Sequence, residues 1–92
     1  MTKDREEQEK AARIFQVLCE AYHSQGPAAT TPVGLIEKET GLMREEVERG
    51  LASLVSQGLV RYWELGDVVT IGPAGIELCE DVTAFARRFS TS

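Results

Sequence analysis

The chain has 92 residues, of which 42% are hydrophobic and 27% are charged, and its formal net charge at pH 7 is −5. This length allows one domain, residues 1–92, and a chain of this size buries only about 60–65% of the surface that its unfolded form exposes, so dimerisation would help to stabilise it. The negative charge is spread along the whole chain without any basic segment or tail, which argues against binding to nucleic acid through a Lys- and Arg-rich tail.

The first expected element is a helix that ends near Ser24. Residues 1–10 are nearly all polar; we expect them to begin as a frayed end and to become the first turns of this helix, with Asp4 as its N-cap. The apolar side chains that follow have helical spacing, namely Ala11, Ile14, Phe15, Leu18, Ala21 and Tyr22. Gly26 followed by Pro27 is a typical helix stop, and a loop over residues 27–31 is expected next.

Two helices joined by a tight turn are predicted over residues 32–57. Thr31 is expected to cap the first of them, with Pro32 at its first position, and Gly41 suits the left-handed residue of the turn. The second helix runs from about Met43 to Gln57, where Gly58 ends it. Its apolar residues at helical spacing indicate a buried stripe, formed by Val47, Leu51 and Leu54.

A β-hairpin and a last helix complete the pattern. Residues 59–71 contain two runs of β-forming residues around a turn at 65–67, which predicts a two-stranded hairpin. Residues 73–89 are predicted as one C-terminal helix with Pro73 at its first position. The expected fold class is therefore mainly α with a small β-hairpin (α+β).

The two cysteines, Cys19 and Cys79, each stand in an apolar helical context. We interpret them as buried thiols that act as small hydrophobic side chains. A redox pair is the alternative, and it requires the first and last helices to pack together. The single histidine, His23, and the lack of any CxxC spacing predict no metal site.

No catalytic pattern stands out. The sequence has no arrangement that indicates a Ser/His/Asp or Cys/His site and no glycine-rich phosphate loop, so we expect neither an enzyme nor a bound cofactor. Nothing resembles a signal peptide, and no apolar run reaches the roughly 20 residues that a membrane span needs. We therefore expect a cytoplasmic protein without a membrane partner.

The order helix, helix, helix, hairpin, helix resembles that of winged helix-turn-helix transcriptional regulators of the MarR, ArsR and PadR type. The segments EKETGLMREEVERGLASLVSQGLV and VVTIGPAGIEL carry the resemblance. In those families a turn helix precedes a recognition helix, then a GLV entry into the wing and a TPxG start to the next helix. These features correspond here to residues 32–39, 43–57, 58–60 and 71–75. The resemblance implies a winged helix with a two-stranded wing and a DNA-binding, transcription-regulating function.

By the family's pattern, the third helix would enter the major groove and the hairpin would touch the DNA backbone or minor groove. Arg49 is the residue best placed to read a base edge, because arginine can bond guanine through two donors. Ser53 and Ser56 are expected to reach phosphate. The predicted DNA contacts are Arg44, Arg49, Ser53, Ser56 and Arg61.

Acidic residues on the same surface favour an alternative function. Glu45 and Glu48 share the outward face of the third helix, and the hairpin tip, Glu64-Leu65-Gly66-Asp67, is acidic where DNA-reading wings often carry Arg or Lys. A solvated helix face explains the two glutamates equally well. The alternative is a winged-helix module that binds protein and not DNA, in which the small outward residues Ala52, Ser53 and Ser56 let a partner helix approach.

Two further surfaces leave alternatives open. One of Tyr62 and Trp63 must face away from the core if the strand alternates; we favour packing or a half-buried position over contact with a partner. The last helix carries an apolar stripe that reaches almost to the chain end and would form a homodimer interface with the first helix of a second copy. Folding of Phe85 and Phe89 back onto the chain's own first helix is the competing expectation. The stripe consists of Leu78, Val82, Phe85 and Phe89.

Overall fold

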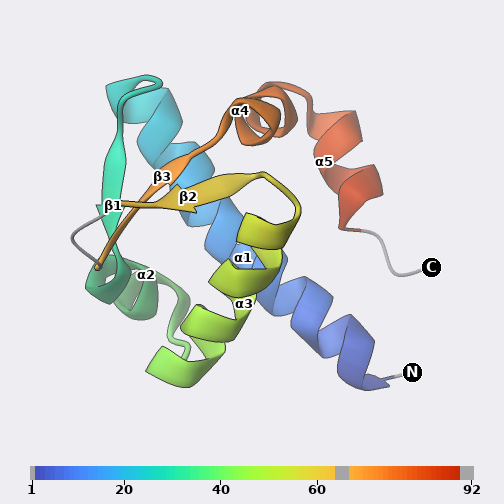
Figure 1. The fold of residues 1–92 in the computed structure, drawn as a ribbon. Helices are drawn as coiled ribbons and strands as arrows, with labels where there is room; N and C mark the ends of the chain where they lie inside the picture. The colour runs from blue at the N-terminus through green and yellow to red at the C-terminus, as the bar shows by residue number, and fades with distance from the viewer. Residues whose placement is uncertain (1, 64–66, 90–92) are drawn as a thin grey trace.

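Helix α1, Thr2–Gln25, packs against α2, α3, α4 and the sheet (Figure 1). The computed structural model describes residues 2–63 and 67–89. The buried positions of α1 are Ala11, Ile14, Phe15, Leu18 and Cys19, which confirms the helical stripe. Gly26 ends the helix with φ 90°. The helix begins at Thr2, ahead of the predicted cap Asp4, so that cap is wrong. Residues 2–10 form its first turns, as expected for the later part of this segment, but without the frayed start that was predicted for its beginning.

The β-structure is a three-stranded antiparallel sheet with the order β1-β3-β2, in which β2 is Val60–Tyr62 and β3 is Val68–Ile71. The hairpin is confirmed, but the loop predicted over 27–31 contains part of the additional strand β1, Thr30–Pro32. Its partners lie far along the chain, at Thr70, Val69 and Val68, so no local pattern reveals it. Proline has no N–H for a strand ladder and is tolerated at a sheet edge, which is where Pro32 lies.

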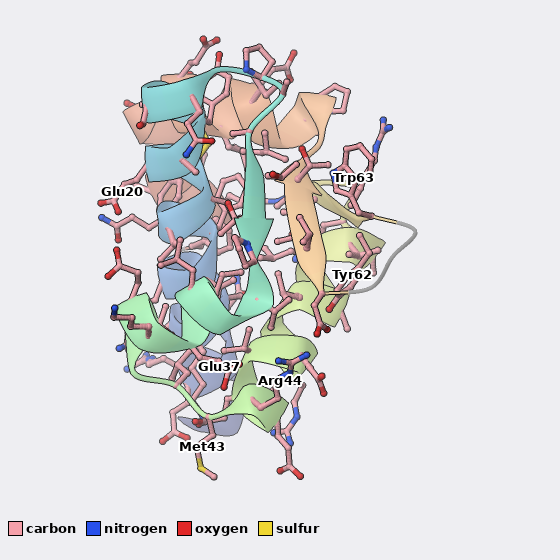
Figure 2. The ribbon with its side chains drawn as sticks, turned by 90° about the vertical axis from the view of Figure 1, so that its left-hand side faces the viewer. Glu20, Glu37, Met43, Arg44, Tyr62 and Trp63 are labelled. Atoms are coloured by element: carbon pink, nitrogen blue, oxygen red, sulfur yellow. A yellow bond between two sulfur atoms is a disulfide. The ribbon has the colours of Figure 1, made fainter. Side chains whose placement is uncertain are left out.

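Helices α2, Val33–Thr40, and α3, Arg44–Ser56, form the predicted pair. Pro32 is the N-cap of α2 and not its first residue, and Thr31 is a buried strand residue instead of the predicted cap. Gly41 has φ 73° and donates its N–H to the Glu37 carbonyl at 2.9 Å, as expected for the turn. Met43, which precedes α3, points into solvent with 70% of its surface exposed (Figure 2).

Helix α3 packs on α1 through its predicted stripe. Val47, Leu51 and Leu54 are fully buried. Gly50 lies against Ile14, and a Cβ at this position would clash with the Ile14 side chain, so the glycine allows α1 and α3 to approach closely. Gly58, with φ 74°, ends the helix as predicted. Buried residues from α1, α2, α3 and the sheet form one core, and the fold class, mainly helical with a small antiparallel sheet, is confirmed.

The C-terminal segment contains two helices, α4, Pro73–Glu80, and α5, Val82–Arg88, where one was predicted over 73–89. The break falls at Asp81, which is extended and accepts a hydrogen bond from the Ala84 N–H at 3.0 Å. Aspartate at this position is a strong N-cap, and it starts a new helix at the expense of the continuous one. Pro73 is the first residue of α4, as predicted.

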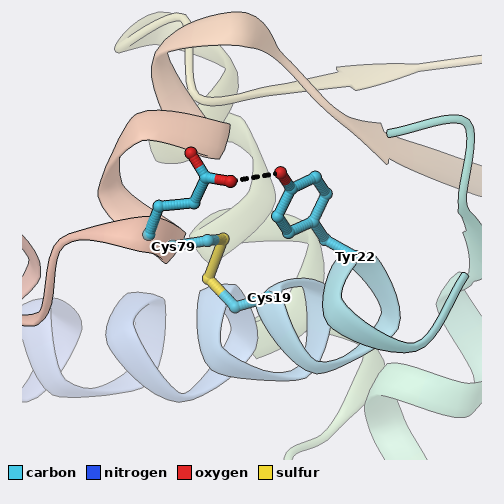
Figure 3. The surroundings of a disulfide bond; sticks show 4 residues. Cys19, Tyr22 and Cys79 are labelled. Atoms are coloured by element: carbon cyan, nitrogen blue, oxygen red, sulfur yellow. Dashed lines mark hydrogen bonds between the residues drawn. A yellow bond between two sulfur atoms is a disulfide. The ribbon is translucent and has the colours of Figure 1, made fainter. Parts of the chain in front are cut away.

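The C-terminal helices fold back onto α1, and a disulfide between Cys19 and Cys79 joins α1 to α4 (Figure 3). The two Cα atoms are 5.3 Å apart. The interpretation as free thiols is therefore wrong, and the alternative pairing is correct because the first and last helices do pack together. Near the bond, the Tyr22 hydroxyl donates to Glu80 at 2.7 Å, and this hydrogen bond raises the pKa of Tyr22.

Phe85 and Phe89 pack on the chain's own α1. Their ring centroids lie 5.7 Å and 5.8 Å from that of Phe15, and 5.0 Å from each other. Of the two expected placements, the structure therefore shows the fold-back onto the first helix. Leu78 is partly buried against the same core, and the side chain of Val82 lies outside what the structure describes. A homodimer stays a prediction.

No helix within residues 2–63 and 67–89 combines the length and the apolar character that a membrane crossing requires.

Candidate interaction surface

Three carboxylates surround Arg44, the first of the predicted DNA contacts. Its Nη2 lies 2.8 Å from Asp67 Oδ1, its Nε 3.1 Å from Glu48 Oε2 and its Nη1 3.2 Å from Glu37 Oε2. These bonds raise the pKa of Arg44 above its usual value. We call these four residues the Arg44 cluster. It carries three negative charges and one positive charge, so it does not provide a positive site for phosphate.

Arg49 lies on the other edge of α3, toward α1. Its side chain is 61% exposed, and its Nη1 is 4.0 Å from Glu7 Oε1. With Ser53 it lines a cavity of about 260 Å³ between α1 and α3. The same cavity contains the ion pair of Lys10 Nζ with Glu46 Oε2 at 2.6 Å, so its four charged side chains balance.

The hydrogen bond from Lys10 lowers the pKa of Glu46, and so does the hydrogen bond from the Met43 N–H. The latter bond, 3.0 Å long, satisfies a donor at the start of α3.

The other predicted contacts do not complete a basic patch. Ser56 donates its hydroxyl to the Ser53 carbonyl at 2.8 Å, and Gln57 donates to the Ser53 hydroxyl at 3.2 Å. Arg61 is exposed on β2. The structure thus places the predicted residues on exposed parts of α3 and β2, but Arg44 and Arg49 face opposite edges of the helix and each lies beside carboxylates. The residues at positions 64–66 of the predicted wing tip lie outside the described part of the chain.

Tyr62 at the end of β2 and Trp63 just after it leave much of their surface in solvent. Tyr62 is 43% exposed and Trp63 is 52% exposed, so both have the half-buried position that was one of the two expected placements, and neither is packed in the core. Figure 2 shows both on the side of the molecule that lies opposite Glu20 of α1. Alternation along the strand, with Val60 and Val69 buried, is the signal that separates the two faces of the sheet.

Trp63 lies on the open face of the sheet. Its N–H donates to the Val68 carbonyl at 2.9 Å, and Val68 in turn pairs with Pro32 of β1. Residues directly opposite one another on adjacent strands point to the same face. Trp63, Val68 and Pro32 therefore form an apolar row across the three strands, and Trp63 and Pro32 are its exposed ends.

Tyr62 connects the edge of β2 to the Arg44 cluster. Partial burial raises the pKa of Tyr62, and the negative charge of Glu48 raises it further, whereas Arg44 lowers it. Val55, 38% exposed, follows Glu48 by two helical turns and so lies on the same side of α3. We use the name β2-edge surface for Glu48, Val55, Tyr62, Trp63 and Asp67.

Within residues 2–63 and 67–89, the outer edge of β2 has no partner strand beside this surface. β2 is the outer strand in the order β1-β3-β2. The Trp63 N–H bonds to Val68, and the Leu59 carbonyl accepts from Gly72 at 2.8 Å. In an antiparallel pair such groups alternate, so Val60 and Tyr62 direct their N–H and C=O groups away from β3. At the opposite edge, Pro32 lacks an N–H and protects β1.

Comparisons with known proteins identify no relative of this chain. No protein-family model matches the sequence, and neither the search of curated proteins nor the search of solved structures finds a match. In the described part of the chain, no three or more His, Cys, Asp or Glu residues are grouped so as to hold a metal ion.

Proposed function

We propose that this chain is a small protein-interaction module of the winged-helix type, which binds an extended segment of a partner protein along the free edge of β2. The observation that carries the proposal is the juxtaposition of this unpaired edge with exposed Tyr62 and Trp63. Addition of a strand to a sheet edge takes its affinity from main-chain hydrogen bonds and its specificity from side chains on either face. Tyrosine and tryptophan are favoured at such interfaces because they combine an apolar body with a polar tip.

The charges beside the edge indicate the chemistry of the partner. Glu48 and Asp67 lie near the aromatic residues, and Arg44 is shared among three carboxylates. Arg61 is a single exposed cation on β2 itself. A segment that alternates basic and apolar residues complements this arrangement, because its apolar side chains pack on Trp63 or Tyr62 while its cations face the carboxylates. A second copy of this chain is disfavoured, since pairing two β2 edges would bring like charges together.

An NMR titration of the ¹⁵N-labelled chain tests the proposal with a short peptide of alternating Lys and Val. We expect saturable amide shifts concentrated at residues 59–63, and no comparable shifts with a peptide in which Glu replaces Lys. Absence of shifts at about 1 mM peptide, which corresponds to a binding free energy of about −4 kcal/mol, or equal binding of the acidic peptide, overturns it. Shifts at the same amides that grow with protein concentration alone would indicate self-pairing instead.

A matched pair of variants checks the location. Trp63→Ala removes an exposed apolar side chain at the β2-edge surface, and Leu35→Ala removes one on α2, where Leu35 is 42% exposed. Trp63→Ala should weaken binding of the basic peptide, and Leu35→Ala should leave it unchanged. The same loss in both variants would contradict binding at β2.

DNA binding is the second candidate, and the order of elements favours it. A helix pair followed by a β-hairpin is the arrangement that winged-helix regulators use to place their second helix in the major groove. The contacts would come from the exposed residues Arg49, Ser53, Ser56 and Arg61. Substitution of Arg49 is the most direct test of this proposal. Fluorescence anisotropy with mixed-sequence duplex DNA at low salt decides it, because nonspecific binders associate at about 10⁻⁴ to 10⁻⁶ M. A flat titration across that range, or a signal that Arg49→Ala does not reduce, counts against DNA.

A further inference from the structure

The Cys19–Cys79 disulfide lies at the wall of an open cavity and is not sealed in the core. Both cysteines line this cavity, which has a volume of about 300 Å³. Cys19 is buried, with 7% of its surface exposed, whereas Cys79 is partly exposed. The rest of the lining combines apolar and polar side chains, from Gln16, Glu20, His23, Leu78 and Phe85.

From this geometry we propose that the disulfide is a thiol-exchange site for low-molecular-weight thiols, and that Cys79 Sγ is the sulfur they attack. Exchange requires a thiolate to reach one sulfur of the bond, and its rate depends on which sulfur is accessible. The cavity gives a small thiol this access at the more exposed Cys79 without unfolding of the domain, whereas Cys19 is buried. The inference is independent of the proposed peptide-binding function.

The reaction has two steps. In the first, the thiolate of the small thiol forms a bond to Cys79 Sγ as the Cys19–Cys79 bond breaks, and the electron pair passes to Cys19 Sγ, which takes a proton from water. In the second, another thiolate attacks the sulfur that the small thiol contributed, and Cys79 leaves as a thiolate. Two molecules of the small thiol are oxidised to their disulfide, and the protein disulfide is reduced to two thiols.

Contacts other than the disulfide hold the start of α4 against Leu59 and its end against α1, and they make the exchange reversible. Gly75 packs directly on the Leu59 carbonyl, where a side chain would not fit, and the Gly72 N–H donates to the same carbonyl at 2.8 Å. The Tyr22–Glu80 hydrogen bond, 2.7 Å long, spans the two helices next to the sulfurs (Figure 3). With these contacts intact, Cys19 stays near the adduct on Cys79 and can displace the small thiol again.

The segment that loses most from reduction is the C-terminal arm, residues 76–89. Beyond the disulfide and the Tyr22–Glu80 bond, the arm is attached by the rings of Phe85 and Phe89 on Phe15. Gln8 also donates to the Arg88 carbonyl at 3.4 Å, and Arg88 Nε donates to Gln57 Oε1 at 3.0 Å. Modification at Cys79 therefore loosens this arm and leaves the sheet and the α1–α3 core in place.

The experiment incubates the folded, oxidised chain with reduced glutathione, quenches samples with an alkylating reagent and maps them by mass spectrometry. We expect a glutathione adduct on Cys79, and reduction in native buffer much faster than global unfolding measured under the same conditions. Hydrogen exchange of the reduced chain should increase much more in residues 76–89 than in α3, whose amides change only through the lower global stability. Reduction no faster than global unfolding, or an adduct confined to Cys19, overturns the proposal.

Two glutamine variants on α1 provide the control for access. Gln16→Phe places a larger side chain at the cavity, and Gln25→Phe makes the same substitution at an exposed position outside it. We expect several-fold slower native-state reduction in Gln16→Phe and an unchanged rate in Gln25→Phe. In concentrated denaturant both variants should react at the same rate, because the cavity no longer exists. Equal native-state rates in the two variants contradict access through the cavity.

Discussion

Aromatic side chains are covered on one side of the molecule and half-exposed on the other. On the side of the C-terminal arm, Phe85 and Phe89 pack on buried Phe15 of α1, and the disulfide joins α4 to the same helix. On the β2 side, Tyr62 and Trp63 are 43% and 52% exposed beside a sheet edge that has no partner strand in the described part of the chain. The C-terminal arm therefore covers apolar side chains of α1 and not those beside β2. This difference is why we assign partner binding to β2 and a structural role to the aromatic rings of the arm.

The attachments on the two sides also differ in strength. A disulfide and buried aromatic contacts remain effective in water, whereas exposed ion pairs such as those of the Arg44 cluster gain little, because solvent screens them and their side chains lose entropy. Substitutions on the arm side should therefore change the free energy of unfolding, and substitutions on the β2 side should change binding.

Removal of the disulfide should have the largest effect. Cys79→Ser opens a loop whose ends are 60 residues apart, and the loop-closure entropy of such a segment is worth about 4 kcal/mol at 25 °C. For a domain of this size each kcal/mol lowers Tm by about 4–8 °C, so we expect a fall of more than about 15 °C in a thermal unfolding experiment. The fully reduced native-sequence chain should match the variant. A fall of only a few degrees in both would show that the disulfide contributes little to the arm side.

Truncation of an aromatic ring of the arm should have the next largest effect. Phe85 is partly buried against the core, so Phe85→Ala should cost less than the roughly 3–5 kcal/mol of a fully buried phenylalanine, about 2 kcal/mol. Urea unfolding measures the loss. Light scattering on the same variant tests the homodimer prediction: because the ring is engaged with Phe15, the mass in solution should not change. If the parent chain has the mass of a dimer and the variant has a lower mass, Phe85 contributes to an interface between two copies.

Local sequence signals reveal the helices of this fold but not its long-range pairings. The stripes of α1 and α3 and the stops at Gly41 and Gly58 follow from spacing and backbone conformation within one element, and they were predicted correctly. Strand β1 and the Cys19–Cys79 bond depend on partners about forty and sixty positions away, which no local pattern specifies. The break at Asp81 had a local signal, an N-cap residue followed by Val82 and Thr83, but the continuous apolar stripe outweighed it.

The candidate site shows the same limit. The ion pair of Arg44 with Glu48 follows from their i,i+4 spacing, and so it was accessible from the sequence. Glu37 and Asp67 lie close to Arg44 only because of the tertiary fold, so the sequence did not predict these two ion pairs. Together they place Arg44, a predicted phosphate contact, at the centre of an acidic cluster.

Substitution of Arg44 should change electrostatics on the β2 side more than stability. Arg44 lowers the pKa of Tyr62, while burial and Glu48 raise it. Arg44→Met should therefore raise the pKa of Tyr62 further, which an ultraviolet titration of the tyrosinate signal can detect. The sign follows because the lost cation stabilised the anionic form. Arg49→Met, on the opposite edge of α3, is the control and should leave this titration unchanged.

Acid should produce a smaller effect through Glu46. Its pKa is lowered in the folded chain by the hydrogen bonds from Lys10 and from the Met43 N–H. A carboxyl group with a depressed pKa stabilises the fold above its unfolded pKa, near 4.5, and this contribution is lost as pH falls through the folded value. Glu46→Gln should therefore flatten the dependence of unfolding free energy on pH below about 4.5, measured by urea unfolding. Glu45→Gln, an exposed neighbour, should retain the slope of the parent chain.

The smallest effect on stability should come from the most exposed aromatic residue, and it divides the two sides most sharply. Trp63→Ala removes a larger side chain than Phe85→Ala does, so side-chain size alone would predict a larger loss of stability. Because half of Trp63 is already in solvent, we expect a change within about 0.5 kcal/mol, together with weaker binding of the basic peptide. A loss as large as that of Phe85→Ala would mean that Trp63 stabilises the sheet as the arm stabilises α1. The exposed aromatic residues at the β2 edge would then have a structural role, and their exposure would no longer support binding of a partner strand.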